Sequence, residues 1–174
     1  QIANTINNVF NIFGIGIASA SAILIGNKIG AGLEEEAKKD ALKISVFGVM
    51  IGIIIGIVFF VVAPLIAMLF KITPETYQNV IVVLRIMAAA LPLRFFGIVQ
   101  IIGVLRGGGD VLYAIVTELV AVWCIGVPLS FLGAVYFKFP IVLVYLMVCL
   151  EEPFKVVATV PRLRSGKWIK NLIK

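Results

Sequence analysis

The sequence predicts an all-α fold, a polytopic membrane bundle of five transmembrane helices. The first observation is composition: of 174 residues, 61% are hydrophobic and 14% are charged, whereas soluble domains have roughly 45–50% and about 25%. The second is a mean hydropathy of +1.13 over the chain. Too few polar residues remain to cover a globule of this size, so most of the surface is expected to contact lipid.

The third observation is a set of five apolar stretches, each long enough to cross a membrane. A hydrocarbon core of about 30 Å needs roughly 20 helical residues, and a helix satisfies its backbone hydrogen bonds within the span. The predicted spans cover residues 6–26, 44–70, 86–105, 111–137 and 141–160, followed by a cytoplasmic tail at 161–174. The chain opens without Met or a basic segment, so we expect it to come from a longer protein.

The distribution of Lys and Arg predicts which ends of the helices face the cytoplasm. One side carries ten: Lys28, Lys38, Lys39, Lys43, Arg106, Arg162, Arg164, Lys167, Lys170 and Lys174. The other side carries three: Lys71, Arg85 and Lys138. Because cytoplasmic loops are enriched in basic residues, we expect a multi-pass protein of the plasma membrane with its C-terminus in the cytoplasm and Gln1 outside.

Composition also excludes several classes of function. The chain has no His, and Cys124 and Cys149 lie inside apolar runs, where we expect free buried thiols rather than metal ligands. The net charge of +6 comes from residues at the ends of apolar segments, so nucleic acid is not an expected partner. Without a GxxxxGK[ST] phosphate loop or a plausible nucleophile with its base, neither enzymatic activity nor a cofactor is expected.

The glycine-rich stretch LRGGGDVLYA is predicted to be a tight cytoplasmic turn between the third and fourth spans. Its glycines permit the positive φ and the close packing that a short reversal needs; they are Gly107, Gly108 and Gly109. Arg106 marks the inner membrane interface, and Asp110 is expected to N-cap the next helix. A structural turn is therefore favoured over a nucleotide cradle.

Glycines and prolines inside the spans predict how the helices pack. Gly48, Gly52 and Gly56 recur every four residues in the second span, and such a stripe lets another helix backbone approach closely. Prolines fall in or near the ends of four spans, at Pro64, Pro92, Pro128 and Pro153. Kinks at prolines are tolerated where neighbours satisfy the freed carbonyls, and they suit a bundle that moves as well as a static one.

Polar side chains inside the spans are the best candidates for function, because they are costly in lipid. Four asparagines share one face of the first span at helical spacing: Asn4, Asn7, Asn8 and Asn11. They form either a hydrogen-bonded seam between helices or the wall of an outward-open substrate cavity. Gln100 in the third span is a further candidate for the cavity.

Two charged residues are predicted at similar depth in neighbouring spans. From the 1.5 Å helical rise, Glu118 lies roughly 12 Å and Arg94 roughly 18 Å from the cytoplasmic boundary. The two side chains can therefore meet, as a structural ion pair or as a site where Glu118 exchanges a proton or cation during transport. In the fifth span, Glu151 and Lys155 are expected to form a structural i, i+4 pair, while Glu152 is a second ion-coupling candidate.

Several motifs in order resemble the multidrug and toxic compound extrusion (MATE) transporters. They are GIGIASASAILIGNKIGAG, VLRGGGD, WCIGVPLSFLGA and LEEPFKVVATVPRLRSGKWIKNL, and the last two look especially like the DinF-like, clostridial type. The resemblance covers essentially the whole chain. It implies five helices of the six-helix C-terminal lobe, matching helices eight to twelve of twelve, with the N-terminal lobe of the same transporter as a partner alongside membrane lipid.

The resemblance also implies export of small amphipathic or cationic compounds, driven by entry of H⁺ or Na⁺ with alternating access. One departure concerns the coupling acid that many members carry in helix ten, because residues 86–105 contain no Asp or Glu. Glu118 is then the local alternative. Two other readings stay open: a flippase for lipid-linked or polysaccharide substrates, and a non-transporting five-span fragment or interaction module.

Overall fold

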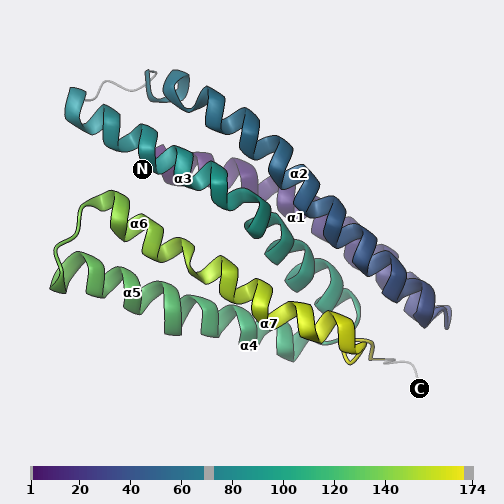
Figure 1. The fold of residues 1–174 in the computed structure, drawn as a ribbon. Coiled ribbons are helices and arrows are strands. Elements are labelled where there is room, and N and C mark those ends of the chain that lie inside the picture. The colour runs from purple at the N-terminus through teal and green to yellow at the C-terminus, as the bar shows by residue number, and fades with distance from the viewer. Residues whose placement is uncertain (1, 69–72, 171–174) are drawn as a thin grey trace.

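The chain folds into a helical membrane bundle (Figure 1), in a computed structural model that describes residues 2–68 and 73–170, without the side chains of residues 2–7, 74 and 75. The elements are α1 (Ile2–Gly30), α2 (Glu34–Met68), α3 (Pro74–Ile98), η1 (Val99–Leu105), α4 (Val111–Val120), η2 (Ala121–Gly126), α5 (Val127–Phe131), η3 (Leu132–Tyr136), α6 (Ile141–Cys149) and α7 (Glu151–Ser165). The η elements are π-helical. Two of the predicted cations lie outside these residues: Lys174, in the part of the predicted tail after residue 170, and Lys71, on the opposite side.

Within residues 2–68 and 73–170, four helical runs are long and apolar enough to cross a membrane, which confirms the predicted all-α membrane bundle. They cover Asn8–Gly30, Glu34–Met68, Thr76–Leu105 and Val111–Tyr136. The last two join α-helical and π-helical segments into one continuous helix, η1 after α3 and η2, α5 and η3 after α4.

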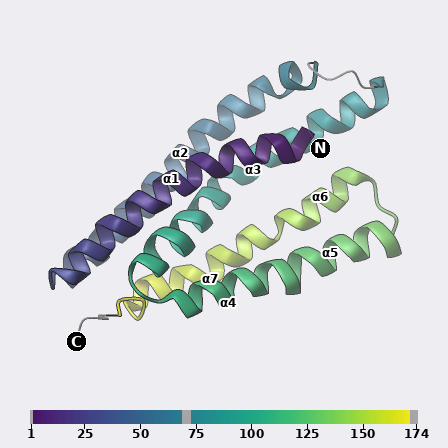
Figure 2. The same ribbon diagram turned by 180° about the vertical axis from the view of Figure 1, so that it is seen from behind.

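The fifth predicted span is built from two consecutive helices, and neither alone reaches the length of the other four. α6 ends at Cys149 and α7 begins at Glu151, with a turn at Leu150 between them. Pro153 accounts for the break, because its nitrogen carries no hydrogen for the carbonyl of Cys149 four residues earlier. In Figures 1 and 2, α6 and α7 nevertheless follow one path, beside the continuous helix that begins with α4.

Two helices begin well before the apolar stretches that were predicted as spans. α2 begins at Glu34 rather than near residue 44 and carries three acidic residues in its first turn, which favours the helix N-terminus. Lys28 at the end of α1 pairs with Glu36 at 2.9 Å and with Asp40 at 2.6 Å. α3 begins at Pro74 rather than near residue 86, after an N-cap at Thr73.

The predicted glycine stripe lies at the contact between α2 and α3. Gly48, Gly52 and Gly56 are all buried on α2. A methyl group added at Gly52 would lie 2.7 Å from the Cα of Pro92, and one at Gly56 would lie 2.7 Å from the carbonyl oxygen of Ala88. Any larger side chain would therefore force the two backbones apart, which confirms the predicted close approach.

The helices form two groups that meet near the α3–α4 turn. α1, α2 and α3 lie together, while α4–η3 and α6–α7 lie side by side in the second group (Figures 1 and 2). Large apolar side chains remain exposed on both, including Ile12 (70%), Val61 (69%) and Leu112 (71%). Such a surface suits lipid or a partner helix rather than water. Cys124 is also exposed and Cys149 partly so, which corrects the prediction that both free thiols are buried.

Candidate functional site

A polar cavity of about 310 Å³ lies between the two helix groups. Its walls come from α1, from α3 with η1, from α4 and from α7: Asn11, Ile15, Arg94, Gly97, Ile98, Ile101, Ile102, Arg106, Glu118, Glu152 and Lys155. The cavity brings together four of the residues predicted for a substrate or coupling site: Asn11, Arg94, Glu118 and Glu152. Charged groups from three distant parts of the chain meet here, from the α3–η1 run, from α4 and from α7, and α1 adds the polar Asn11.

The centre of this site is the ammonium group of Lys155. Its Nζ lies 3.3 Å from Oε1 of Glu118, 3.6 Å from Oε1 of Glu151 and 3.9 Å from Oε2 of Glu152. The side chains of Lys155 and Glu152 are 9% and 7% exposed, whereas that of Glu118 is 42% exposed. We call these four residues the Lys155 cluster.

The predicted pair between Arg94 and Glu118 was wrong in its partner. Glu118 pairs with Lys155, and among the described residues Arg94 takes part in no ion pair, although it lines the same cavity. The helical rise gave the depth of both residues correctly enough to place them at one cavity. Rise alone does not give the rotation of α7, which directs Lys155 toward Glu118.

Sequence reasoning missed the central role of Lys155 and gave it only a structural pair with Glu151. That pair is present. The missed signal was the spacing of EEPFK, in which Lys155 is three residues from one acid and four from another, so both acids face it on one side of the helix. Charged side chains are costly in lipid, so a helix face with two acids and a base is expected to point into the protein.

A second, smaller cavity of about 180 Å³ adjoins the first. Arg94 and Glu152 line both cavities, and Tyr145, Cys149 and Glu151 line the smaller one. The break between α6 and α7 therefore lies in the wall of this second cavity. Gly126 in η2 makes room for the acid opposite, since a methyl group there would lie 2.9 Å from Oε2 of Glu151.

The other predicted cavity residues lie elsewhere or outside the description. Gln100 is fully buried, and its Nε2 donates to Oγ of Ser45 on α2. It is a contact between η1 and α2 rather than a cavity residue, which corrects the prediction. Asn8 is exposed and does not line the cavity, while the side chains of Asn4 and Asn7 lie outside the described residues.

The glycine-rich turn is structural, as predicted, and its glycines provide the predicted positive φ and close packing, but the role of Asp110 differs. Gly109 has φ +89°, and Gly107 and Gly108 permit close contact instead: a methyl group at Gly107 would lie 2.7 Å from the Cα of Ala22. Asp110 occupies the N-cap position of α4 without a side-chain cap hydrogen bond, which corrects its predicted role. Arg106 is exposed at the turn and lines the large cavity.

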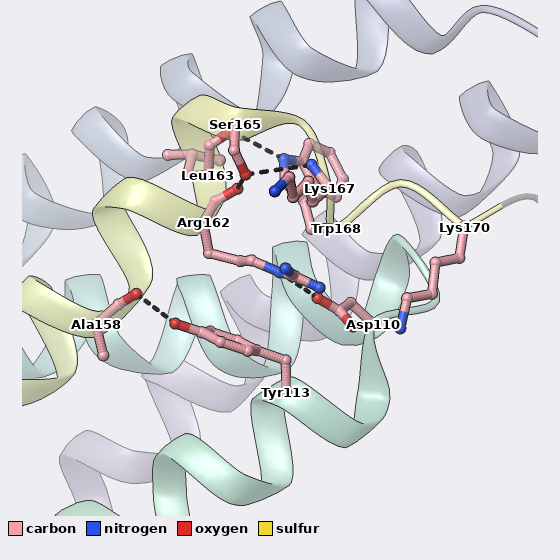
Figure 3. Close-up of polar contacts among 9 residues, drawn as sticks. All are labelled: Asp110, Tyr113, Ala158, Arg162, Leu163, Ser165, Lys167, Trp168 and Lys170. Atoms are coloured by element: carbon pink, nitrogen blue, oxygen red, sulfur yellow. Dashed lines mark hydrogen bonds and ion pairs between the residues drawn. The ribbon is translucent and has the colours of Figure 1, made fainter.

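The carboxylate of Asp110 binds the C-terminal segment instead (Figure 3). Nε of Arg162 donates to its Oδ2 at 2.7 Å, and Nζ of Lys170 lies 2.5 Å from its Oδ1. Burial by itself would raise the pKa of Asp110, but the hydrogen bonds from Arg162 and Lys170 outweigh it and hold that pKa below its ordinary value. Residues 161–170 are thus folded onto the turn rather than forming a free tail.

Comparisons with known proteins point to membrane transport. A family model for MatE matches residues 1–132. The chain is 23% identical over 160 residues to a Bacillus subtilis (strain 168) protein described as "Uncharacterized transporter YisQ", an alignment that covers 92% of this chain and 35% of that protein. The chain thus spans about a third of the length of this curated relative, and no solved structure matches it. The family match ends at Leu132, so three of the four residues of the Lys155 cluster, those on α7, lie beyond it.

Proposed function

This chain belongs to the MatE family, whose members are membrane transporters, and from that premise we propose that it forms part of a proton-coupled exporter of small amphipathic or cationic compounds. The observation that carries the proposal is the Lys155 cluster, in which three carboxylates surround one ammonium group beside a polar cavity. The coupling residues are Glu118 and Glu152. The protein acts in the plasma membrane together with the other lobe of the same transporter.

The charge of the cluster supports coupling to a cation. With all four side chains ionised, three negative charges face one positive charge, and two of the four groups are almost fully buried. Arg94 and Arg106 line the same cavity but form no ion pair among the described residues, so the carboxylates around Lys155 keep a local surplus of negative charge. Such a surplus is unfavourable in a poorly solvated site, and uptake of a proton or a cation stabilises it. A proton and a cationic substrate then compete for the same carboxylates, which is the requirement for exchange of one for the other.

The arrangement of the carboxylates favours H⁺ over Na⁺. All three approach one point, and the Nζ of Lys155 already occupies that point. A sodium ion needs several oxygen atoms around itself, as other hard cations do. A proton needs one carboxylate oxygen, so it can enter the cluster without displacing Lys155.

Arg94 and Asn11 are proposed as substrate contacts. Both line the large cavity, and Arg94 also faces the small one. The two cavities together hold three cationic and three anionic side chains: Arg94, Arg106 and Lys155 against Glu118, Glu151 and Glu152. This balance does not favour a pyrophosphate-bearing lipid, which needs an excess of positive charge, so export of cationic compounds remains the better proposal than a flippase.

The test is drug efflux from everted membrane vesicles containing the full-length transporter, with pH and sodium gradients imposed separately. Glu152→Gln is expected to abolish proton-driven efflux, because Gln cannot release a proton. Glu118→Gln, at the more exposed carboxylate, is expected to reduce it by about tenfold. The matched control is Glu36→Gln, which also removes an ion-paired acid but lies at the start of α2, far along the chain from the cavity.

Two results would contradict the proposal. If the double variant Glu118→Gln with Glu152→Gln exports as fast as the parent under a pH gradient, the cluster does not couple transport to protons. If a sodium gradient alone drives efflux and a pH gradient does not, the coupling ion is Na⁺. Efflux by the Glu36→Gln control within about twofold of the parent shows that losing one surface acid is not enough to explain the effect.

A further inference from the structure

Three polar contacts join α4 to α7 along their lengths. From the cytoplasmic end, Arg162 donates to Asp110 at 2.7 Å, and the hydroxyl of Tyr113 donates to the carbonyl of Ala158 at 2.8 Å. The third is the ion pair between Lys155 and Glu118 at 3.3 Å. Residue numbers rise on α4 as they fall on α7, so the helices run antiparallel, and the three contacts span roughly 12 Å of α4.

The lowest contact is fixed by a folded C-terminal segment, residues 162–170, which we call the C-terminal latch. The chain reverses at Gly166, which has φ +67°. The backbone N–H of Lys170 then donates to the carbonyl of Gly108 at 2.8 Å, and Ile169 pairs with Gly109 in a β-bridge. Both cations on Asp110, Arg162 and Lys170, come from this segment (Figure 3).

Trp168 anchors the latch in the turn. It is fully buried, and its indole N–H donates to the carbonyl of Leu163 at 3.1 Å. The ring lies directly on Gly108, where an added methyl group would lie 2.3 Å from Cε3 of the indole. Only glycine fits there, so the turn and the latch form one closely packed unit.

We propose that the C-terminal latch sets the register of α7 against α4, so that Lys155 stays directed at Glu118; Asp110, Arg162 and Trp168 are positioning residues for the Lys155 cluster. Successive helical positions differ by about 100° around the axis. A shift of α7 by one residue therefore rotates Lys155 by about 100° and moves its ammonium group away from Glu118. The inference rests on the proposed coupling role of the cluster, but its first measurement does not depend on transport.

The first measurement is hydrogen exchange of the α7 amides in the purified full-length transporter. Asp110→Asn and Arg162→Gln are expected to raise exchange across residues 151–165 by about tenfold, because the cytoplasmic end of α7 is released. The control is Arg164→Gln, which removes the same charge two residues away. Arg164 is exposed and takes part in no ion pair among the described residues, so exchange in this variant is expected to match the parent.

The second measurement is the pH dependence of efflux in the same variants. Arg162→Gln is expected to move the pH of half-maximal efflux, since a displaced Lys155 no longer lies 3.3 Å from Glu118 among the carboxylates of the cluster. Arg162→Lys keeps the charge and is expected to restore most of the parent profile. A purely structural role of the latch would lower the amount of active protein without moving this pH.

Gly108→Ala provides a variant that keeps every charge and displaces Trp168, in case the charge variants fail to fold. It is expected to raise exchange in α7 and to move the pH profile in the same direction as Arg162→Gln. The inference is overturned if Asp110→Asn, Arg162→Gln and Gly108→Ala exchange like the parent, or if exchange rises while the pH profile stays fixed. If Glu118→Gln leaves efflux unchanged, the proposed function fails, while the exchange data still decide whether the latch holds α7.

Discussion

At the scale of single residues, Asp110 shows how a buried charge can be stabilising. Its side chain is 1% exposed, and a carboxylate placed there alone would be strongly destabilising. Two cations from the C-terminal latch meet its two oxygen atoms, and the guanidinium of Arg162 also lies over the ring of Tyr113, 4.7 Å from the centroid. The hydrogen bonds of Asp110 therefore depend on a segment more than fifty residues away in sequence.

The lowered pKa of Asp110 predicts that the latch stays closed at physiological pH. A carboxylate whose pKa is lower in the folded state gives stability that is complete above its ordinary pKa, here 3.8, and is lost as the pH falls through the folded value. Protection of the Lys170 amide, corrected for the intrinsic exchange rate, is therefore expected to stay constant between about pH 5 and 8. Loss of protection centred within that range would show that another group controls the latch.

The candidate site could be predicted from the sequence in its members but not in its pairing. Asn11, Arg94, Glu118 and Glu152 were found because polar groups in apolar spans need a shared polar space. Their partners depend on helix rotation, which neither hydropathy nor helical rise provides. Gln100 shows the converse error, because a buried polar side chain can bind a neighbouring helix instead of facing a cavity, here through the hydrogen bond from its Nε2 to Ser45.

At the scale of helices, the contact between α2 and α3 predicts that Gly52 cannot be enlarged. Gly52→Ala places a methyl group against the backbone of Pro92, which cannot move as a flexible side chain would. We expect a loss of about 1–3 kcal/mol of stability, as for other overpacked sites, measured as a lower melting temperature of the detergent-solubilised full-length protein.

The control for this variant is Gly16→Ala in α1, where an added methyl group meets nothing within 4 Å. Alanine also favours helix over glycine, so the control is expected to keep or raise the melting temperature. Equal losses in both variants would mean that glycine flexibility, rather than the close approach of α2 to α3, is what the stripe provides.

Helix ends were the least predictable part of the fold. Hydropathy locates the apolar part of a helix. The helix itself can start earlier, where acidic residues in its first turn interact favourably with the helix dipole. This is the case for the acidic first turn of α2. The tail was misjudged for a related reason: its charges indicated solvent, whereas Trp168 and two of its cations pack on the glycine turn.

At the scale of the whole molecule, the loops assigned to the cytoplasm meet at one end of the bundle. Gly166 after α7 lies against the side chain of Lys38 near the start of α2, and Gly26 in α1 lies against the carbonyl of Gly107. Basic residues therefore gather at one end although they come from distant parts of the chain. Which side of the membrane this end faces stays a prediction of the positive-inside rule.

Cysteine labelling tests that orientation in intact cells. In a cysteine-free full-length background, Lys138→Cys, in the exposed turn between η3 and α6, is expected to react with a membrane-impermeant maleimide. Lys167→Cys, exposed in the C-terminal latch, is expected to react only after the cells are permeabilised. The reverse pattern would place the C-terminus outside and would contradict the charge count.

The break at Leu150 divides the fifth predicted span into two helices that can change their angle at this residue. The C-terminal end of α7 is held by Asp110 and Trp168. The N-terminal end of α6 follows the turn at Lys138. The nine residues of α6 make a helix of roughly 13 Å, so a tilt of about 20° at Leu150 would displace its far end by roughly 5 Å. Glu151 and Glu152 directly follow Leu150. Because they lie next to the point of rotation, a tilt of α6 displaces them very little. A tilt of α6 at Leu150 would therefore move its far end and leave Glu151 and Glu152 close to Lys155.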